Sequence, residues 1–435
     1  MAELWKKDIL YSILRPAVDL CTRRSFRKLK ICGKDRIPLE GMIIFAPNHC
    51  NALLDALAIL LVCRGPIAFG CRADIFRNKT AARLLRFLKI LPVPRIRDGV
   101  EALKSGRASS DEAADALAHG LPYTLFSEGT HRAMRSLLPI RKGIFRVAAD
   151  ALARAGEVQD SEPLLYVVPV GLEYSDYYHY RSNLLINIGE PVDIGLFLKE
   201  NASVTPAGQF KLFAELLKSR LSSQITFLED DEEYPSKINV LNFLSGGCRG
   251  SSERHLRQRQ ELASSVERAA KVFPREFRSL AVRSSELEAL RLRFGVGLDS
   301  FGCRHPFLRG SAKLLASVLL LPFFICCALL SLPVWLTAEL ISLRLKDKVF
   351  ANSIRFVVRF FGMMILVPLW CVAAFLSLPP LPAAGALLLA LPSVSLVYDW
   401  CALLKSAFSD LSCWAHPSLS DKYRQLVDRF RTLAM

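Results

Sequence analysis

The sequence lacks the short motifs of several common catalytic sites. It contains no G-x-x-x-x-G-K-[ST] loop for nucleotide phosphates, which argues against the use of ATP. It has no H-E-x-x-H motif and no cluster of cysteine and histidine, so nothing indicates a bound metal ion. It also has no G-x-S-x-G elbow, which argues against a serine hydrolase. The chemistry is therefore expected to need neither a metal nor a bound cofactor.

Paired-cysteine motifs are missing as well. The twelve cysteines include no C-x-x-C pair, and Cys326 and Cys327 are adjacent within an apolar stretch. This usage is typical of reduced, small apolar side chains and not of a disulfide framework. The formal net charge is +16, yet no RNA-recognition, zinc-finger or helix-turn-helix pattern accompanies it. The positive charge therefore favours an anionic membrane surface as partner over nucleic acid.

Charge is absent from two long stretches near the C-terminus, residues 314–338 and 360–398. About 20 apolar residues in a helix are enough to span a bilayer. A proline-rich segment, Pro379 to Gly385, divides the second stretch and predicts a helical hairpin of residues 357–378 and 384–404. The C-terminal region is therefore expected to be helical and embedded in a membrane.

The basic residues around these stretches bear on their orientation. The positive-inside rule places basic segments in the cytoplasm. The loop 343–359, the tail after residue 404 and the region before residue 314 are all basic. All three can be cytoplasmic if the hairpin crosses twice and residues 314–338 are re-entrant, which is the arrangement we favour. In the alternative, residues 314–338 cross the membrane fully.

The N-terminal segment combines bases with apolar residues. Between residues 3 and 29 the apolar positions recur at helical spacing among lysines and arginines. This pattern predicts an amphipathic helix over residues 1–30 that lies in the membrane interface. A helix packed on the rest of the protein is the alternative, and the two are compatible.

Short apolar runs alternate with helical patterns in the region that follows, up to about residue 195, which is typical of an α/β domain. Strands are predicted at residues 42–46, 67–70, 122–126, 164–172 and 184–188. Helices are predicted at residues 53–63, 76–89, 98–105, 110–119 and 143–155.

One histidine and one aspartate follow the first of these strands closely. Pro47 ends the run Met42–Ala46, since proline cannot donate to a sheet ladder. His49 comes next, and Asp55 lies near the start of an apolar helical run. If His49 lies in the turn before the helix, Asp55 can hold one ring nitrogen while the other accepts a proton from a substrate hydroxyl. The alternative is a solvated histidine and an aspartate favoured near a helix N-terminus by the helix dipole.

Three further patterns occur in order along the chain: Leu91-Pro92-Val93-Pro94-Arg95, Phe126-Ser127-Glu128-Gly129-Thr130 and Val168-Pro169-Val170. Together with the His49–Asp55 segment they resemble the four sequence blocks of the glycerolipid acyltransferases, the family that makes lysophosphatidate and phosphatidate. The resemblance covers residues 30–195. It implies a mixed sheet flanked by helices, to which this chain adds the C-terminal helical membrane region.

Two departures from the family pattern stand out. The family has four residues between its histidine and aspartate, whereas five separate His49 from Asp55. The longer spacing resembles the branch that acylates glycerol-3-phosphate or dihydroxyacetone phosphate. In the third block, Ser127 replaces the family's proline and His131 its arginine, so Arg132 is expected to supply the missing cation.

The resemblance also suggests residues that bind substrate. Arg95, with Arg97 beside it, stands where the family has a phosphate-binding arginine, and an arginine can hold two phosphate oxygens at once. By the same resemblance, Glu128 and Gly129 form the floor of the acceptor site, with Thr130 next to them. Lys142, which opens a predicted helix, is expected to add a phosphate contact.

Four regions are thus predicted: an interfacial helix (1–30), a catalytic domain (31–240), a basic helical linker region (241–310) and membrane-embedded helices with a basic tail (311–435). The family resemblance implies an integral membrane O-acyltransferase of phospholipid biosynthesis whose catalytic domain faces the cytoplasm. The acyl donor would be acyl-CoA or acyl carrier protein. The acceptor would be glycerol-3-phosphate, dihydroxyacetone phosphate or 1-acylglycerol-3-phosphate. The alternatives are an acyltransferase for another lysolipid or an amino-acid lipid, and a non-catalytic lipid-binding membrane scaffold.

Overall fold

The structure is a computed structural model that describes residues 4–6, 8–93, 110–158, 162–246, 250 and 252–434. The chain divides into two compact units. The first comprises Met1–Arg23, Leu29–Tyr174 and Leu184–Ile225, and the second comprises Arg24–Lys28, Ser175–Asn183 and Thr226–Met435. The domain boundaries at residues 30, 240 and 310 stay predictions.

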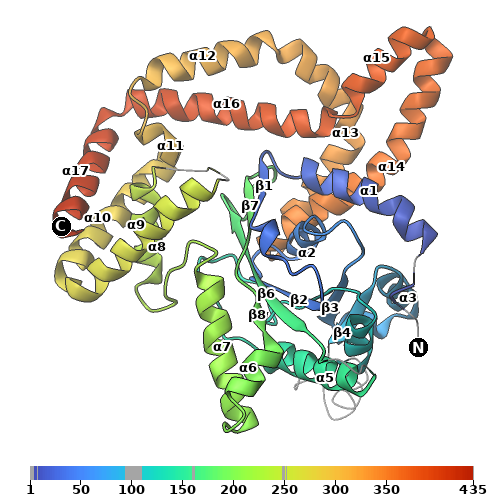
Figure 1. The fold of residues 1–435 in the computed structure, drawn as a ribbon. Helices are drawn as coiled ribbons and strands as arrows, with labels where there is room; N and C mark the ends of the chain where they lie inside the picture. The colour runs from blue at the N-terminus through green and yellow to red at the C-terminus, as the bar shows by residue number, and fades with distance from the viewer. Residues whose placement is uncertain are drawn as a thin grey trace. The chain divides into compact units, whose positions relative to one another are not determined.

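A single mixed sheet forms the centre of the first unit (Figure 1). Its strands in the described residues are β1 (Leu29–Cys32), β2 (Met42–Pro47), β3 (Ala68–Arg72), β4 (Ile90–Val93), β5 (Tyr123–Thr124), β6 (Leu165–Tyr174), β7 (Leu184–Ile188) and β8 (Val192–Asp193). They are ordered β1-β7-β6-β2-β5-β3-β4, with β8 paired to β6. The predicted mixed α/β sheet is confirmed, because β2 to β6 pair in parallel while β7 and β8 run antiparallel to β6.

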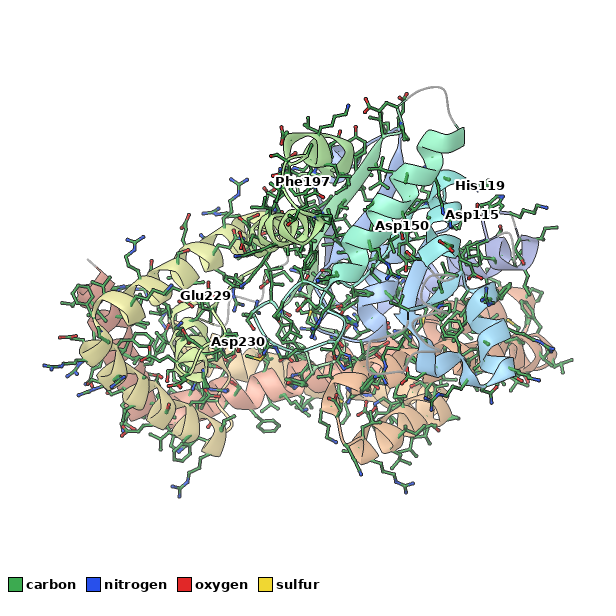
Figure 2. All side chains as sticks on the ribbon, turned by 90° about the horizontal axis from the view of Figure 1, so that it is seen from below. Asp115, His119, Asp150, Phe197, Glu229 and Asp230 are labelled. Atoms are coloured by element: carbon green, nitrogen blue, oxygen red, sulfur yellow. The ribbon has the colours of Figure 1, made fainter. Side chains whose placement is uncertain are left out.

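Helices surround this sheet. They are α1 (Ile9–Arg24), α2 (Leu53–Leu60), α3 (Lys79–Phe87), α5 (Lys142–Val158), α6 (Ile194–Glu200) and α7 (Pro206–Ser222), with residues 110–118 also helical. α5, α6 and α7 all contact β6. Phe145, Phe197 and Phe213 join these three helices, with ring centroids 5.1–6.2 Å apart; Figure 2 labels Phe197. An apolar core therefore fixes β6, the strand on which part of the site depends.

The sequence prediction was incomplete at several elements. β1, β4 and β8 were not expected, and the predicted helix 76–89 is two elements, the 3₁₀ turn Ala73–Arg77 and α3. Asn78 separates them, because its side chain accepts from the backbone N–H groups of Thr80 and Ala81 and so caps α3. The predicted helix 98–105 lies outside the described residues.

The direction of the parallel strands positions the site. β2, β3, β4 and β5 all point the same way. Their carboxyl ends therefore share one edge of the sheet, which is where open α/β sheets bind ligands. β2 ends at Pro47 and β5 at Thr124. The segments that begin with His49 and Phe126 consequently emerge side by side.

The regular elements of the second unit, in its described part, are all helices. Its helices are α8 (Tyr234–Leu244), α9 (Glu253–Val272), α10 (Pro274–Arg293), α11 (Leu298–Phe301), α12 (Pro306–Leu319), α13 (Leu321–Arg344), α14 (Ala351–Ser377), α15 (Pro380–Ala390), α16 (Ser393–Ala415) and α17 (Pro417–Ala434). α16 packs against α12 and α13, and α14 packs against α13 and α15. α10 packs against α8, α9 and α17.

Among the described residues, two helical stretches of this unit are long and apolar enough to cross a membrane: α13 (Leu321–Arg344), of 24 residues, and Lys348–Ser377, of 30 residues, which joins a short 3₁₀ turn to α14. The expected segment 314–338 is not one helix, because it breaks at Leu320, just before Pro322. The second arm of the hairpin, expected at 384–404, is divided between α15 and α16, which bend by 46°. A helical C-terminal region is confirmed, and its membrane topology stays a prediction.

Polar side chains on these helices pair with one another. The guanidinium of Arg355 on α14 donates to both carboxylate oxygens of Glu339 on α13, at 2.8 and 2.9 Å. The Tyr398 hydroxyl on α16 donates to the same carboxylate at 2.6 Å. Arg181, from the short segment Ser175–Asn183 of this unit, binds Asp399 on α16. A charge in an apolar environment is costly unless it is paired, so these contacts fasten the helices together.

A glycine in β6 provides a test of how closely this strand of the first unit packs against Gln224, just after α7. A Cβ atom at Gly171 would lie 2.4 Å from the backbone oxygen of Gln224, which is far inside van der Waals contact. Gly171→Ala is expected to lower the free energy of unfolding by about 1–3 kcal/mol, seen as a lower unfolding temperature of the full-length protein in detergent.

The matched control is Gly65→Ala, because a Cβ atom there would meet nothing within 4 Å. That variant should unfold at the wild-type temperature. Equal unfolding temperatures for the two variants would contradict the close approach of β6 to Gln224.

Candidate active site

His49 and Asp55 form a hydrogen-bonded pair at the carboxyl end of β2. The Nδ1 atom of His49 lies 2.8 Å from Oδ2 of Asp55. The Asp55 side chain is fully buried, while that of His49 is 16% exposed. Since an ionised carboxylate can only accept, it selects the histidine tautomer with the proton on Nδ1. The predicted hydrogen bond is confirmed, and Nε2 is left as a proton acceptor.

Asp55 is held by three further nitrogen and oxygen donors. Its Oδ2 atom accepts from the backbone N–H groups of Cys50 at 2.7 Å and Asn51 at 2.6 Å. Its Oδ1 atom accepts from the hydroxyl of Tyr174, the last residue of β6, at 2.7 Å. Four nitrogen and oxygen donors thus converge on one buried carboxylate, with the Cys50 thiol as a longer contact to Oδ1 at 4.0 Å. They fix its orientation and satisfy both oxygens.

The five residues between His49 and Asp55 are accommodated by a turn. Ala52 precedes α2 with φ +46°, in the region that L-residues rarely adopt. Asp55 then lies in the first turn of α2. The spacing, longer by one residue than the family pattern, therefore leaves the His49–Asp55 contact intact.

Glu128 supports the other side of the histidine. Its Oε1 atom accepts from the backbone N–H of His49 and its Oε2 atom from that of Leu138, both at 2.8 Å. Burial raises the pKa of this carboxyl, and the two N–H donors oppose the shift. Gly129 follows with φ +72°, which favours glycine. Glu128 therefore connects the loop that carries His49 to the backbone at Leu138. This role needs two acceptor oxygens.

Aromatic rings surround the imidazole. The ring of Phe126 stacks on that of His49 with centroids 4.1 Å apart. His131, at the position of the family's arginine, contacts the same imidazole edge-on at 5.4 Å. These contacts limit the rotation of His49, so its free nitrogen faces a fixed direction.

The remaining predicted site residues lie at different distances from this pair. Arg132 is next to it, because its backbone N–H donates to the His49 carbonyl at 3.0 Å, while its guanidinium donates to Ser136. Thr130 is exposed. The ammonium of Lys142 lies 5.7 Å from the ring centre of Phe210. Arg95 and Arg97 lie outside the described residues. The substrate-binding roles of all five residues stay predictions.

Tyr174 and Asn48 were missed by the sequence analysis. The side chain of Asn48 exchanges two hydrogen bonds with the backbone of Leu172, at 2.7 and 3.3 Å, and so continues the pairing of β2 with β6 beyond Pro47. Tyr174 lies two residues beyond the predicted end of this strand. The signal was its place at the end of a long strand next to β2, but only the register brings its hydroxyl to Asp55.

Cys50 is an unsuitable nucleophile although it adjoins His49. It is 2% exposed, and burial raises the pKa of its thiol well above the usual value, with the Asp55 carboxylate adding to the shift. A thiol with a raised pKa carries little of the reactive thiolate. Within the described ranges, no group of three or more His, Cys, Asp or Glu side chains is placed to hold a metal ion.

The role of Glu128 can be tested by an isosteric change. In Glu128→Gln an amide nitrogen replaces one acceptor oxygen, so one of the two backbone N–H groups faces a donor. The loss of such a buried acceptor costs about 1–3 kcal/mol. We expect a lower unfolding temperature and at least a tenfold loss of catalytic turnover, because the loop that carries His49 loses its support.

The control for charge is Glu190→Gln, since Glu190 is 69% exposed in its pair with Arg36. It should behave as the wild type in both assays. Wild-type turnover in Glu128→Gln would show that the two backbone contacts do not position His49.

Comparison with known proteins gives one family match. A family model described as "Acyltransferase" matches residues 28–173. Among solved structures, the chain is similar to the 1-acyl-sn-glycerophosphate (LPA) acyltransferase PlsC from Thermotoga maritima, with 18% identity over 48% of this chain and 79% of that one and a TM-score of 0.35. No curated protein matches. The family model therefore indicates an acyltransferase domain over residues 28–173, in agreement with the acyltransferase resemblance of the sequence motifs.

Proposed function

We propose that this protein is a membrane-bound O-acyltransferase of phospholipid biosynthesis. It would transfer a fatty acyl group from acyl-CoA or acyl carrier protein to the hydroxyl of glycerol-3-phosphate, dihydroxyacetone phosphate or 1-acylglycerol-3-phosphate. The observation that carries the proposal is the 2.8 Å bond between His49 Nδ1 and Asp55 Oδ2 within a matched acyltransferase domain. In this pair, His49 would act as a general base whose free nitrogen, Nε2, lies at the carboxyl edge of the sheet.

With this arrangement, the acyl group can pass directly from the thioester to the acceptor hydroxyl. His49 Nε2 takes the proton of the acceptor hydroxyl while its oxygen attacks the thioester carbonyl. The tetrahedral intermediate collapses, the C–S bond breaks, and the imidazolium returns the proton to the leaving thiolate. Asp55 stabilises the imidazolium formed between these steps. No covalent enzyme intermediate is needed, in keeping with the buried thiol of Cys50.

The acceptor phosphate would be bound by Arg95, with Arg97, Arg132 and Lys142 as further cations. β4 ends at Val93, and this strand is parallel to β3 and β5. The chain therefore leaves β4 at the same edge of the sheet as His49, two residues before Arg95. Glu128 and Gly129, with Thr130 beside them, would form the floor on which the acceptor lies.

The long apolar helices of the second unit support a lipid product. α13 and the helix Lys348–Ser377 are long and apolar enough to span a bilayer. An acyltransferase with such helices can deliver an acylated product directly to the lipid phase. We place the catalytic domain on the cytoplasmic side, where acyl-CoA and acyl carrier protein occur and where the basic loops are expected.

The first test is acyl transfer by purified protein with labelled acyl-CoA and acyl carrier protein. Glycerol-3-phosphate, dihydroxyacetone phosphate and lysophosphatidate are offered in parallel. Product from one of them, reduced at least about 100-fold in His49→Ala because the general base is lost, would support the proposal and identify the acceptor.

Cys50→Ala is the matched control for a thiol nucleophile and should retain transfer. No product from any of the three acceptors would contradict the proposal. Transfer to another lysolipid or an amino-acid lipid would then support a different acyltransferase, and lipid binding that survives His49→Ala without transfer in either protein would indicate a scaffold.

Tyr174 gives a second kinetic test. Tyr174→Phe removes the hydroxyl that donates to Asp55, and a hydrogen bond to a charged group contributes about 1.5–3 kcal/mol. We expect kcat to fall about tenfold or more with little change in KM, because the base loses orientation while the substrate contacts remain. Tyr166→Phe, on the same strand, should leave kcat unchanged, and equal effects of the two changes would contradict this role.

A further inference from the structure

A charged cleft lies in the first unit, away from the His49–Asp55 pair. It has a volume of about 600 Å³ and is lined by the side of α1, the loop after α2 and the turn before β4. Gly65 and Pro66 precede the start of β3, and Lys89 precedes the start of β4. Since β2, β3 and β4 run in parallel, this cleft is at the amino edge of the sheet, opposite the catalytic edge.

Positive charge dominates the lining. Five cations line the cleft: Lys6, Arg15, Arg23, Arg64 and Lys89. Asp8 and Asp19 are the two acids. Both carboxylates are engaged, since Asp8 accepts from the backbone N–H of Tyr11 at 3.0 Å and Asp19 from the Arg15 guanidinium at 2.8 Å. The cleft thus has a surplus of three positive charges by this count.

The five cations differ in what they contact. Arg15 is structural, because its guanidinium also donates to the carbonyls of Leu60, Cys63 and Gly65 and so caps the end of α2. Arg23 and Arg64 are exposed, and the described residues offer neither of them a hydrogen bond or an ion pair. These two guanidinium groups are therefore available to a ligand.

Lys89 forms the charged floor of the cleft. It is 5% exposed, and its ammonium donates to the backbone carbonyls of Leu4 and Lys6 and lies 5.5 Å from the ring centre of Tyr11. Burial lowers the pKa of this ammonium. Its backbone has φ +61°, in the region that L-residues rarely adopt. The hydrogen bonds of this buried cation go to neutral carbonyls and Asp8 offsets only part of its charge, so a further anion in the cleft would stabilise it.

The apolar face of α1 indicates where that anion comes from. Ile9, Ile13 and Leu20 are 80%, 67% and 59% exposed, and at 100° per residue they fall within about 40° of one another. Arg23, which lines the cleft, lies about 60° from the centre of this stripe, and Leu20 of the stripe also lines the cleft. A helix that places such a stripe in the acyl layer brings its flank to the depth of the lipid headgroups.

We propose that this cleft binds the phosphate of an anionic phospholipid in the membrane surface on which α1 lies. Arg23 and Arg64 contact the phosphate from the rim, and Lys89 contributes positive charge from below. The site is separate from the acceptor site, and it holds the catalytic domain at the membrane through a lipid that the enzyme does not acylate.

The test measures binding of radiolabelled dioctanoylphosphatidylglycerol to the full-length protein in uncharged detergent, with dioctanoylphosphatidylcholine as the zwitterionic control. Each cation near anionic lipid contributes a factor of about five. We therefore expect Arg23→Gln/Arg64→Gln to bind phosphatidylglycerol about 25-fold more weakly. The matched control Arg146→Gln/Lys211→Gln, on α5 and α7, should bind as the wild type.

Two further measurements distinguish this site from the catalytic site and from a site for soluble anions. Phosphatidylglycerol binding should survive His49→Ala, which separates it from the catalytic site and from the outcome of the acyl-transfer assay. It should also persist against millimolar inorganic phosphate or CoA, and displacement by either at that concentration would show a site for soluble anions. Equal affinity for the two lipids, or unchanged phosphatidylglycerol binding in Arg23→Gln/Arg64→Gln, would overturn the proposal.

Discussion

The site depends on one buried carboxylate that accepts four hydrogen bonds from nitrogen and oxygen donors. Asp55 receives the imidazole of His49, two backbone N–H groups from the turn before α2, and the hydroxyl of Tyr174. A buried carboxylate without such donors would be very costly. Because the donors come from the turn before α2 and from the end of β6, these hydrogen bonds require the parallel pairing of β2 with β6. The packing of the sheet therefore determines, through Asp55, how the imidazole of His49 is oriented.

The edge strands and loops of the sheet were harder to predict than its centre. The central strands β2, β6 and β7 were predictable because each is a buried apolar run flanked by a proline, a turn or a helical pattern. β1, β4 and β8 have only two to four residues, so periodicity says little about them. Asn78 splits a continuous helical pattern through its cap, a contact that spacing alone does not reveal.

The same contrast holds for the candidate site. The His49–Asp55 bond followed from local sequence, since both groups lie in one turn. Tyr174 lies 119 residues from Asp55, and its contribution depends on strand register, which no local pattern encodes. The closeness of Lys89 to Arg64 could likewise not be predicted from sequence. The turn after α3 and the loop after α2 come together only when β3 pairs with β4. α2 connects both regions: Asp55 lies in its first turn, and Arg15 caps its last.

The division of the chain into units has a consequence for its synthesis. Ser175–Asn183 lies between β6 and β7 in sequence, yet it belongs to the helical unit, where Arg181 binds Asp399. During translation this segment emerges more than two hundred residues before its partner. β6 and β7 must therefore pair around a loop whose own contacts do not yet exist. The segment directly follows Tyr174, the last residue of β6 and a donor to Asp55, so this strand leads into a loop whose partner is translated much later. The protein thus cannot be assembled as two successive, independent domains, and a gene rearrangement that exchanged one unit as a cassette would cut through the other.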